Sequence, residues 1–160
     1  MDPRRRWVLL AYRLPREPST PRIGVWRQLR RLGVAQLGDG VVAVPLDART
    51  REQLEWLAQE IFDHGGEATV WLAEPALAAD QRAMAATLAA AVAVDYERVI
   101  QAAVADVGAA LAIRRRTASR LRREMRRIAA RDYFPGPVRD RARDAIEALA
   151  SSTRPDEAAS

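Results

Sequence analysis

The sequence contains no cysteine, no lysine and no asparagine, and it has a single histidine, His64. Without cysteine, the chain can hold no disulfide, no thiolate zinc site and no iron–sulfur cluster. His64 lies in a turn expected to end a helix, so a histidine-based metal site is disfavoured. All 26 basic residues are arginines. This composition indicates codon bias in a GC-rich genome, so the choice of arginine over lysine carries little functional weight.

Long apolar runs are also missing. No segment reaches the roughly 20 apolar residues that a membrane-spanning helix needs, and the alanine-rich stretch 83–94 is too short. The first residues have a basic lead and an apolar run, but Arg13 interrupts that run and no small-residue cleavage pattern follows. With 160 residues, 49% of them hydrophobic, we expect one domain or one domain with an appendage. A soluble cytoplasmic protein is the expectation.

The first clear structural prediction concerns the segment from Trp7 to Pro15, WVLLAYRLP. Its apolar run is short, contains β-branched and aromatic residues and ends at a proline. This pattern is typical of a strand covered on both faces. Such a strand belongs in the middle of a sheet, with later strands beside it and helices packed on it.

A helix is expected next. Ser19 or Thr20 can cap it, Pro21 suits its first turn, and Gly33 is the expected end. The apolar side of this helix is predicted to comprise Ile23, Trp26, Leu29 and Leu32.

A hairpin is predicted from the segments 34–37 and 41–45, which flank the turn Gly38-Asp39-Gly40. The turn is not a phosphate loop, because it lacks a strand–loop–helix context and a Gly-Lys-Ser/Thr signature. A second helix is expected to begin at Thr50, which forms a capping-box pattern with Gln53. Its inward residues are predicted to be Leu54, Leu57, Ala58, Ile61 and Phe62.

The segment 67–72, EATVWL, completes the pattern as a fourth strand. The order strand, helix, strand, strand, helix, strand over residues 1–75 predicts a ferredoxin-like βαββαβ domain, with both helices on one face of an antiparallel sheet. In that topology the first and third strands are central, and their segments, WVLLAY and VVAV, are the most apolar. The predicted fold class is α+β: this unit, a helical extension over residues 76–150, and a disordered tail over 151–160.

The extension carries a long apolar stripe at helical spacing: Met84, Leu88, Val92, Tyr96, Val99, Ala103, Val107 and Leu111. It continues into a basic amphipathic helix, 114–131, and ends in a short helix, 138–149. Two arrangements of residues 80–131 remain open. A single rod would present the arginines to solvent, whereas a hairpin breaking near 112–117 would set them against Asp95, Glu97 and Asp106.

The net charge of +5 is concentrated in residues 114–131, which hold nine arginines and one glutamate. Eight of these arginines lie opposite a narrow apolar stripe, and only Arg114 lies in line with it. Such a surface could neutralise the phosphates of nucleic acid. It could also be a solvated face that pairs with acidic residues beside it or with an acidic protein. A membrane surface suits it less, because the stripe is narrow and lacks aromatic anchors.

Few residues could carry chemistry. Ser19 and Ser119 have no histidine base near them, so a nucleophilic triad is not expected. Glu67, Glu74 and Asp39 are metal-ligand candidates only by default. We therefore expect no catalytic residue, no cofactor and no metal. The tryptophans on amphipathic elements are expected to pack in the interior and not to stack on bases: Trp26, Trp56 and Trp71.

Several motifs together resemble the N-terminal region of the chromate-resistance regulator ChrB. They are the run Tyr-Arg-Leu-Pro-Arg-Glu-Pro-Ser from Tyr12, the Thr-Arg-Glu-Gln helix start, and the basic helix that ends in Asp-Tyr-Phe. The resemblance spans residues 7–150 and implies a cytoplasmic transcriptional regulator that acts on DNA. The resemblance also implies a C-terminal domain that the family usually carries and that is tied to the chromate response, and we expect no counterpart of it within these 160 residues.

The βαββαβ segment is also similar to the C-terminal domain of the phenylacetate repressor PaaX and to small CRISPR-associated endonucleases. In those nucleases, a metal-binding aspartate follows the aromatic residue of the first strand. Here Arg13 follows Tyr12, and a cation at that place argues against nuclease activity.

The leading hypothesis is a non-enzymatic DNA-binding regulator, expected to form a homodimer through the ferredoxin-like sheet. The alternatives are a protein-interaction module with an acidic partner and, less favoured, a metal-dependent nuclease relative. The candidate DNA-binding residues on the basic helix are Arg115, Arg116, Arg120, Arg122, Arg123, Arg126 and Arg127. Candidates from the first domain are Arg13, Arg16, Arg22, Arg27, Arg30 and Arg31, and Arg4 to Arg6 could extend the same basic surface.

Overall fold

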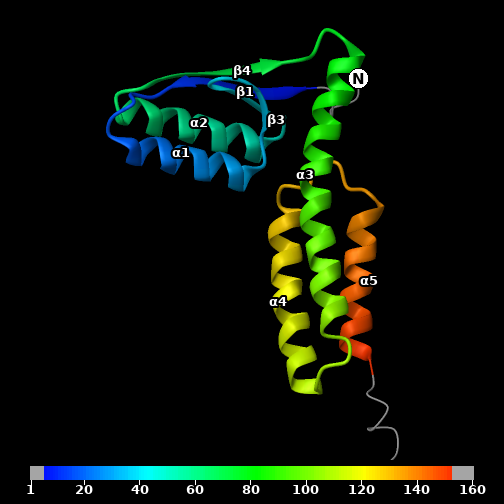
Figure 1. The fold of residues 1–160 in the computed structure, drawn as a ribbon. Helices are drawn as coiled ribbons and strands as arrows, with labels where there is room; N and C mark the ends of the chain where they lie inside the picture. Colours follow the sequence, from blue (N-terminus) through cyan, green and yellow to red (C-terminus); the bar gives the residue numbers. More distant parts are fainter. Residues whose placement is uncertain (1–5, 153–160) are drawn as a thin grey trace, which may run out of the picture. The chain divides into compact units, whose positions relative to one another are not determined.

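A computed structural model describes residues 6–152 of the chain (Figure 1). Its contacts divide the chain into two units, residues 1–88 and 89–160. The helices and strands are β1 (Trp7–Arg13), α1 (Ser19–Leu32), β2 (Ala35–Gly38), β3 (Val41–Pro45), α2 (Ala48–Asp63), β4 (Glu67–Ala73), α3 (Ala78–Ala105), α4 (Leu111–Ala129) and α5 (Pro137–Ser151). Within residues 6–152, no helix is long and apolar enough to span a bilayer.

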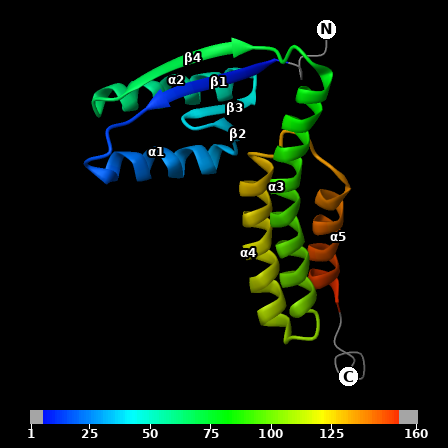
Figure 2. The same ribbon diagram turned by 45° about the horizontal axis from the view of Figure 1, so that its top comes forward.

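The first unit contains the predicted ferredoxin-like arrangement. Its four strands form one sheet in the order β2-β3-β1-β4, and β1 pairs antiparallel with both of its neighbours (Figure 2). Helices α1 and α2 lie on the same face of this sheet (Figure 1). The α+β fold class and the central position of β1 and β3 are therefore confirmed.

The two faces of β1 differ in burial. Val8 and Leu10 point toward the helices and are fully buried in the core of this unit. On the opposite face, Leu9 is only half-buried, and its cross-strand neighbour Trp71 is 58% exposed. Trp7 is fully buried on that face, as is Ala43 of β3, the register partner of Leu9. The indole N–H of Trp7 donates to Gln81 Oε1 at 2.6 Å. The prediction of a strand covered on both faces is therefore confirmed for only part of the strand, at Trp7, because the two helices occupy one face and burial on the other face is incomplete beyond Trp7.

Helix α1 covers the predicted segment, and Leu29 and Leu32 are buried as predicted. The predicted cap at Ser19 or Thr20 is wrong, because the N-cap residue is Pro18, and two of the predicted inward residues are exposed. The helix begins at Ser19 without a side-chain cap. It ends before Gly33, which has a left-handed φ of 76° and whose N–H donates to the carbonyl of Leu29. Val25, Leu29 and Leu32 are buried. Ile23 and Trp26, which were predicted to be inward, are 45% and 54% exposed. Ile23 and Trp26 lie on a different part of the helix circumference from Val25, and the side that contains Val25 is the one that packs against the sheet.

Helix α2 begins one turn earlier than expected. Asp47 is its N-cap, and Asp47 and Thr50 form a reciprocal capping box, with Thr50 N–H donating to Asp47 Oδ1 at 2.7 Å. The predicted box of Thr50 with Gln53 is therefore wrong. The Thr50 hydroxyl instead donates to the carbonyl of Pro45 at 2.7 Å, which ties the helix start to β3.

The predicted inward positions of α2 are confirmed except for one residue. Leu54, Leu57, Ala58 and Ile61 are buried, but Phe62 is 52% exposed. Trp56 is also exposed, by 71%, because it lies on the side of the helix opposite Leu54. Together with the exposure of Trp26 and Trp71, this overturns the expectation that these tryptophans pack in the interior.

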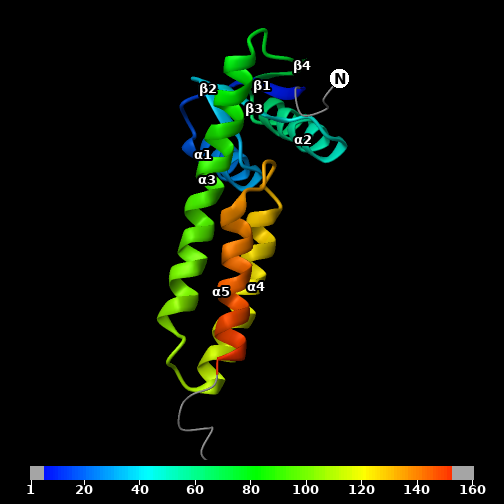
Figure 3. The same cartoon turned by 90° about the vertical axis from the view of Figure 1, so that its right-hand side faces the viewer.

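The second unit is an antiparallel bundle of the later part of α3, α4 and α5 (Figure 3). Its core includes Val92 and Val99 of α3, Leu121 of α4 and Ile146 of α5. The chain reverses over residues 106–110, so the hairpin arrangement holds and the rod does not. The break lies a few residues before the expected 112–117. Residues 153–160 of the predicted tail, and also Arg4 and Arg5, lie outside the described residues.

A polar network connects α3, the α4–α5 loop and α5 at the end of this bundle where α4 is followed by α5. The hydroxyl of Tyr96 donates to Asp132 Oδ2 at 3.0 Å, and Arg139 lies 3.9 Å from the same carboxylate oxygen. Tyr96 is 1% exposed. Burial, followed by the hydrogen bond to Asp132, raises the pKa of Tyr96 to about 12.

Candidate nucleic-acid interface

The exposed side of α4 is built almost entirely from arginine. Seven side chains on it are exposed, and together we call them the arginine face: Arg115, Arg116, Arg120, Arg122, Arg123, Arg126 and Arg127. The opposite side of the helix buries Ala118, Leu121 and Ile128 against the other helices of the bundle. This amphipathic pattern fixes the rotation of α4, so the seven guanidinium groups face outward.

The arginine face consists of two rows. At about 100° per residue, Arg115, Arg122 and Arg126 fall within about 40° of one another on the helix circumference. The second row, about 110° away, comprises Arg116, Arg120, Arg123 and Arg127. Because Arg122 pairs with Glu147 of α5, the first row lies on the side of α5. From Arg115 to Arg126 this row extends about 17 Å along the helix at 1.5 Å per residue.

Arg114 is the exception among the arginines of the segment. Its side chain is 1% exposed and lies on the buried side of α4, where the sequence places it in line with the apolar stripe. It is therefore part of the interior of the bundle and not of the arginine face.

Three arginines of the face have a polar partner. Arg122 pairs with Glu147 at 3.0 Å, Arg120 lies 3.7 Å from Glu124, and Arg123 donates to the Ser119 hydroxyl at 3.1 Å. Over residues 6–152, no acidic side chain pairs with the other four: Arg115, Arg116, Arg126 and Arg127. The face thus keeps most of its charge uncompensated by its own fold.

The second row borders a hollow of about 480 Å³ next to α3. Arg120, Arg123 and Arg127 line it together with Arg131, and the acidic residues in its wall are Asp95 and Glu124. Arg131 is held in place by Asp95, with Nη2 and Oδ2 2.6 Å apart. Four arginines against two carboxylates leave an excess of positive charge, which suits an anionic group the size of a phosphate.

The acids of α3 do not neutralise the face, although the chain forms a hairpin. Asp95 pairs with Arg131 and with Arg98, while Glu97 pairs with Arg141 of α5 at 2.9 Å. Asp106 accepts a hydrogen bond from the Thr117 hydroxyl at 2.6 Å. The expected pairing of the 114–131 arginines with α3 is therefore confirmed for Arg131 with Asp95, whereas the seven residues of the arginine face take no partner from these three acids.

The candidate arginines of the first unit lie on β1, in the loop that follows it and on α1. Arg13 pairs with Glu67, its register partner on β4, at 2.7 Å, and both side chains are largely exposed. Arg30 stacks on Trp26, with its guanidinium carbon 4.9 Å from the ring centroid. Arg16, Arg27 and Arg31 are exposed. Residues 6–152 contain no cluster of three potential metal ligands.

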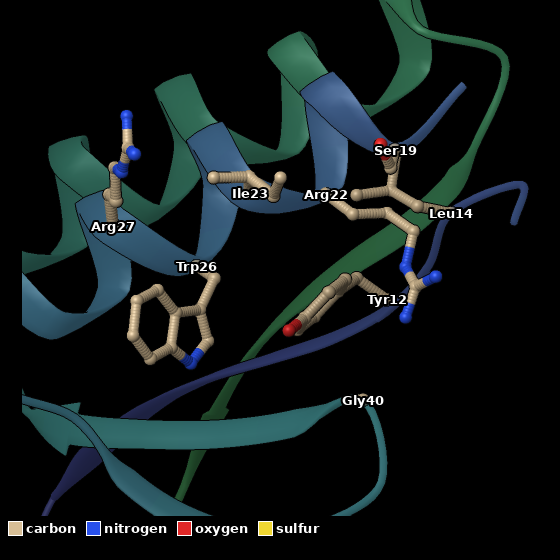
Figure 4. A pocket seen from close by; sticks show the side chains of 8 residues that line it. All are labelled: Tyr12, Leu14, Ser19, Arg22, Ile23, Trp26, Arg27 and Gly40. Atoms are coloured by element: carbon tan, nitrogen blue, oxygen red, sulfur yellow. The ribbon is translucent and has the colours of Figure 1, made fainter. Parts of the chain in front are cut away.

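Sequence reasoning missed a hollow in the first unit, between the start of α1 and the end of β1 (Figure 4). Tyr12, Ile23 and Trp26 line it together with Arg22 and Arg27. A signal existed, because Ile23 and Trp26 lie off the stripe formed by Val25, Leu29 and Leu32. Large apolar residues away from the buried side of a helix indicate a second contact surface.

Comparison with known proteins identifies the family. A sequence profile described as "Protein ChrB, N-terminal" matches residues 22–112, which are more than half of the chain. The chain belongs to the ChrB N-terminal family. Protein ChrB of Cupriavidus metallidurans is 33% identical over 81 residues, which are 51% of this chain and 24% of that protein. The chain thus matches about a quarter of the length of this ChrB relative.

The family match has a defined extent on the structure. The match runs from the first turn of α1 to the start of α4, so the arginine face lies C-terminal to the matched residues in the sequence. No solved structure matches the chain significantly. Membership of the ChrB N-terminal family therefore rests on the segment from α1 to α3, and the case for the arginine face rests on its own geometry.

Proposed function

We propose that the chain is a cytoplasmic, non-enzymatic DNA-binding regulator of the chromate-resistance type, and that the arginine face binds the phosphates of duplex DNA. The observation that carries this proposal is the exposure of seven arginines on one side of α4, four of them without an acidic partner in residues 6–152. Membership of the ChrB N-terminal family supports the regulatory role.

The physical basis is the release of counterions. Each arginine that neutralises a phosphate releases condensed cations from DNA, so the logarithm of the affinity falls with the logarithm of the salt concentration, by about 0.9 per contact. If all seven arginines engage phosphates, the slope is about −6. The hollow beside Arg123 and Arg127 offers a place where one phosphate can lie between several guanidinium groups.

The test is a DNA-binding titration of the full chain at two salt concentrations. The variant replaces the four arginines without acidic partners by glutamine: Arg115, Arg116, Arg126 and Arg127. Between about 50 and 200 mM salt, the unmodified chain should lose a factor of several thousand in affinity, and the variant only about 40-fold. At the lower concentration the variant should already bind more weakly.

A matched control removes the same charge elsewhere. It replaces four arginines that form ion pairs away from the face, namely Arg51, Arg98, Arg141 and Arg143. Both variants lower the net charge by the same amount, so a general charge effect predicts equal losses. The proposal requires the variant of the arginine face to lose much more affinity and more of the salt dependence than the control.

Two alternatives give different results in the same experiment. If the arginines serve an acidic protein partner, the unmodified chain should show no salt-sensitive affinity for any duplex. If the chain is a nuclease relative, the duplex should be cut when Mg²⁺ is present, whereas the regulator leaves it intact.

We also propose that the chain forms a homodimer through the face of the sheet that α1 and α2 leave uncovered. Leu9, Thr69 and Trp71 lie on that face, and Trp71 is 58% exposed, which is large for an indole. A second copy would bury it. Trp71→Glu should convert a dimer to a monomer in analytical ultracentrifugation, while Trp56→Glu on the other face should not. An unmodified chain that sediments as a monomer would refute the dimer.

A further inference from the structure

The hollow in the first unit has the size of a small-molecule site. Its volume is about 560 Å³, within the range of about 300–1,000 Å³ that is usual for ligand pockets. It lies where the first two turns of α1 pass over the end of β1 and the β2–β3 turn (Figure 4). All of its lining residues belong to the first unit, so the hollow is complete without α4.

The fold keeps this hollow open. Gly40 lies at its edge with a φ of 71°, and its carbonyl accepts the N–H of Tyr12 at 2.7 Å. This bond holds the β2–β3 turn against β1 below the helix. On the opposite side, α1 turns Val25 into the core, and this rotation leaves Ile23 and Trp26 beside the hollow, 45% and 54% exposed. Exposed groups of that size are unfavourable in water unless something covers them.

The apolar part of the hollow is aromatic. The rings of Tyr12 and Trp26 both point into it (Figure 4). The guanidinium of Arg30 lies over the Trp26 ring, with its central carbon 4.9 Å from the ring centroid. Flat aromatic rings prefer an offset or edge-on aromatic neighbour. The lining therefore suits a planar ring better than a flexible aliphatic chain.

The polar part of the hollow is cationic. In Figure 4 the guanidinium of Arg22 lies beside the Tyr12 ring and toward Gly40, whereas the side chain of Arg27 points away from the hollow. No acidic residue lines the hollow, and no ion pair within residues 6–152 involves Arg22. The hydroxyl of Tyr12 can donate a hydrogen bond, and burial raises its pKa.

We propose that this hollow binds a small planar aromatic anion, with its ring against Trp26 and Tyr12 and its anionic group on Arg22. The site is separate from the proposed DNA contact and goes beyond it. An aromatic carboxylate and a nucleoside monophosphate both have the required chemistry, because each joins a flat ring to an anionic group.

The test follows the four indole N–H signals of the full chain by NMR during titration. The probes are indole-3-acetate and adenosine monophosphate, each compared with its uncharged counterpart, indole-3-acetamide or adenosine. At least one anionic probe should shift the Trp26 signal in a saturable way and bind more tightly than its uncharged counterpart. The signal of Trp56, which is 71% exposed on α2, should not move. Preference for indole-3-acetate or for adenosine monophosphate identifies the source of the anion.

Variants separate the two halves of the site. Arg22→Gln should lower the affinity for the anionic probe by about tenfold or more, the usual cost of a lost charged hydrogen bond. It should not change the affinity for the uncharged probe. Arg51→Gln, which removes an exposed arginine of α2, should change neither. Trp26→Ala should abolish binding of the anionic and the uncharged probe. Because Trp26 is exposed, this variant is expected to fold.

Three results would overturn the proposal. The first is the absence of a saturable shift with either anion. The second is an Arg22→Gln variant that binds the anion as tightly as the unmodified chain. The third is a parallel movement of the Trp26 and Trp56 signals, which would indicate non-specific association with exposed indoles.

Discussion

Replacing Gly40 by alanine should destabilise the first unit by about 2–3 kcal/mol. With its φ of 71°, an alanine would cost about 1–2 kcal/mol for the left-handed conformation alone. A Cβ at Gly40 would also overlap the carbonyl oxygen of Tyr12. The turn would have to move, which would weaken the 2.7 Å bond between Tyr12 N–H and the Gly40 carbonyl, worth about 1 kcal/mol.

Tryptophan fluorescence during urea denaturation measures this loss selectively, because all four tryptophans of the chain belong to residues 1–88. With a slope of about 1–3 kcal/mol per molar urea, a loss of this size should lower the midpoint by about 0.7–3 M. Gly38→Ala is the matched control in the same hairpin. Gly38 has no positive φ, and nothing lies within 4 Å of a Cβ placed there. Equal midpoints for the two variants would refute the reasoning.

Three further predictions concern stability. Asp47→Ala removes the cap that receives the N–H of Thr50 and should cost about 1 kcal/mol, seen as a lower urea midpoint of tryptophan fluorescence. Because the folded state raises the pKa of Tyr96 to about 12 from the usual value near 10, the stability that Tyr96 provides is complete below about pH 10 and is lost as the pH rises toward 12. Tyr96→Phe should remove that loss in circular-dichroism denaturation curves recorded above and below about pH 10. Glu67→Gln breaks the exposed pair with Arg13 and should change stability by less than about 1 kcal/mol in the same urea assay, and a larger loss would contradict the solvent screening of this pair.

The sheet could be predicted from the sequence because its signals are redundant. The segments of β1 and β3 are more apolar than those of β2 and β4, and this contrast identifies the two central strands. The turn at Gly40 and the stop at Gly33 require a left-handed backbone that glycine adopts without strain. Each of these signals is local, and each agrees with the topology.

The errors occurred where two local patterns overlapped. Asp47-to-Thr50 and Thr50-to-Gln53 have the same spacing, and a tertiary contact of Thr50 with the carbonyl of Pro45 favours the first. In α1, a stripe through Ile23 and Trp26 competes with one through Val25, and only the position of the sheet decides between them. Periodicity gives the period of a helix but not which of two adjacent faces is buried.

The candidate interface was predictable only in part. The concentration of arginine on one side of α4 is a property of the sequence. The partners of Asp95 and Glu97 are not, because they depend on the rotation of α3 against α4 and α5. Since these acids pair with Arg131 and Arg141, the arginine face stays largely free.

The place of β1 in the sheet has a consequence for synthesis of the chain. β1 is made first, yet its two neighbours are β3 and β4, and Trp7 pairs with residues as distant as Ala73. At about 5–20 residues per second, the ribosome makes the intervening chain in about 3–13 s. Both edges of this apolar strand stay unpaired until β3 is made, and one edge stays unpaired until β4 is made, a condition that promotes aggregation. Arg6 and Arg13 flank the strand, and charged residues in such positions oppose self-association until β4 is complete.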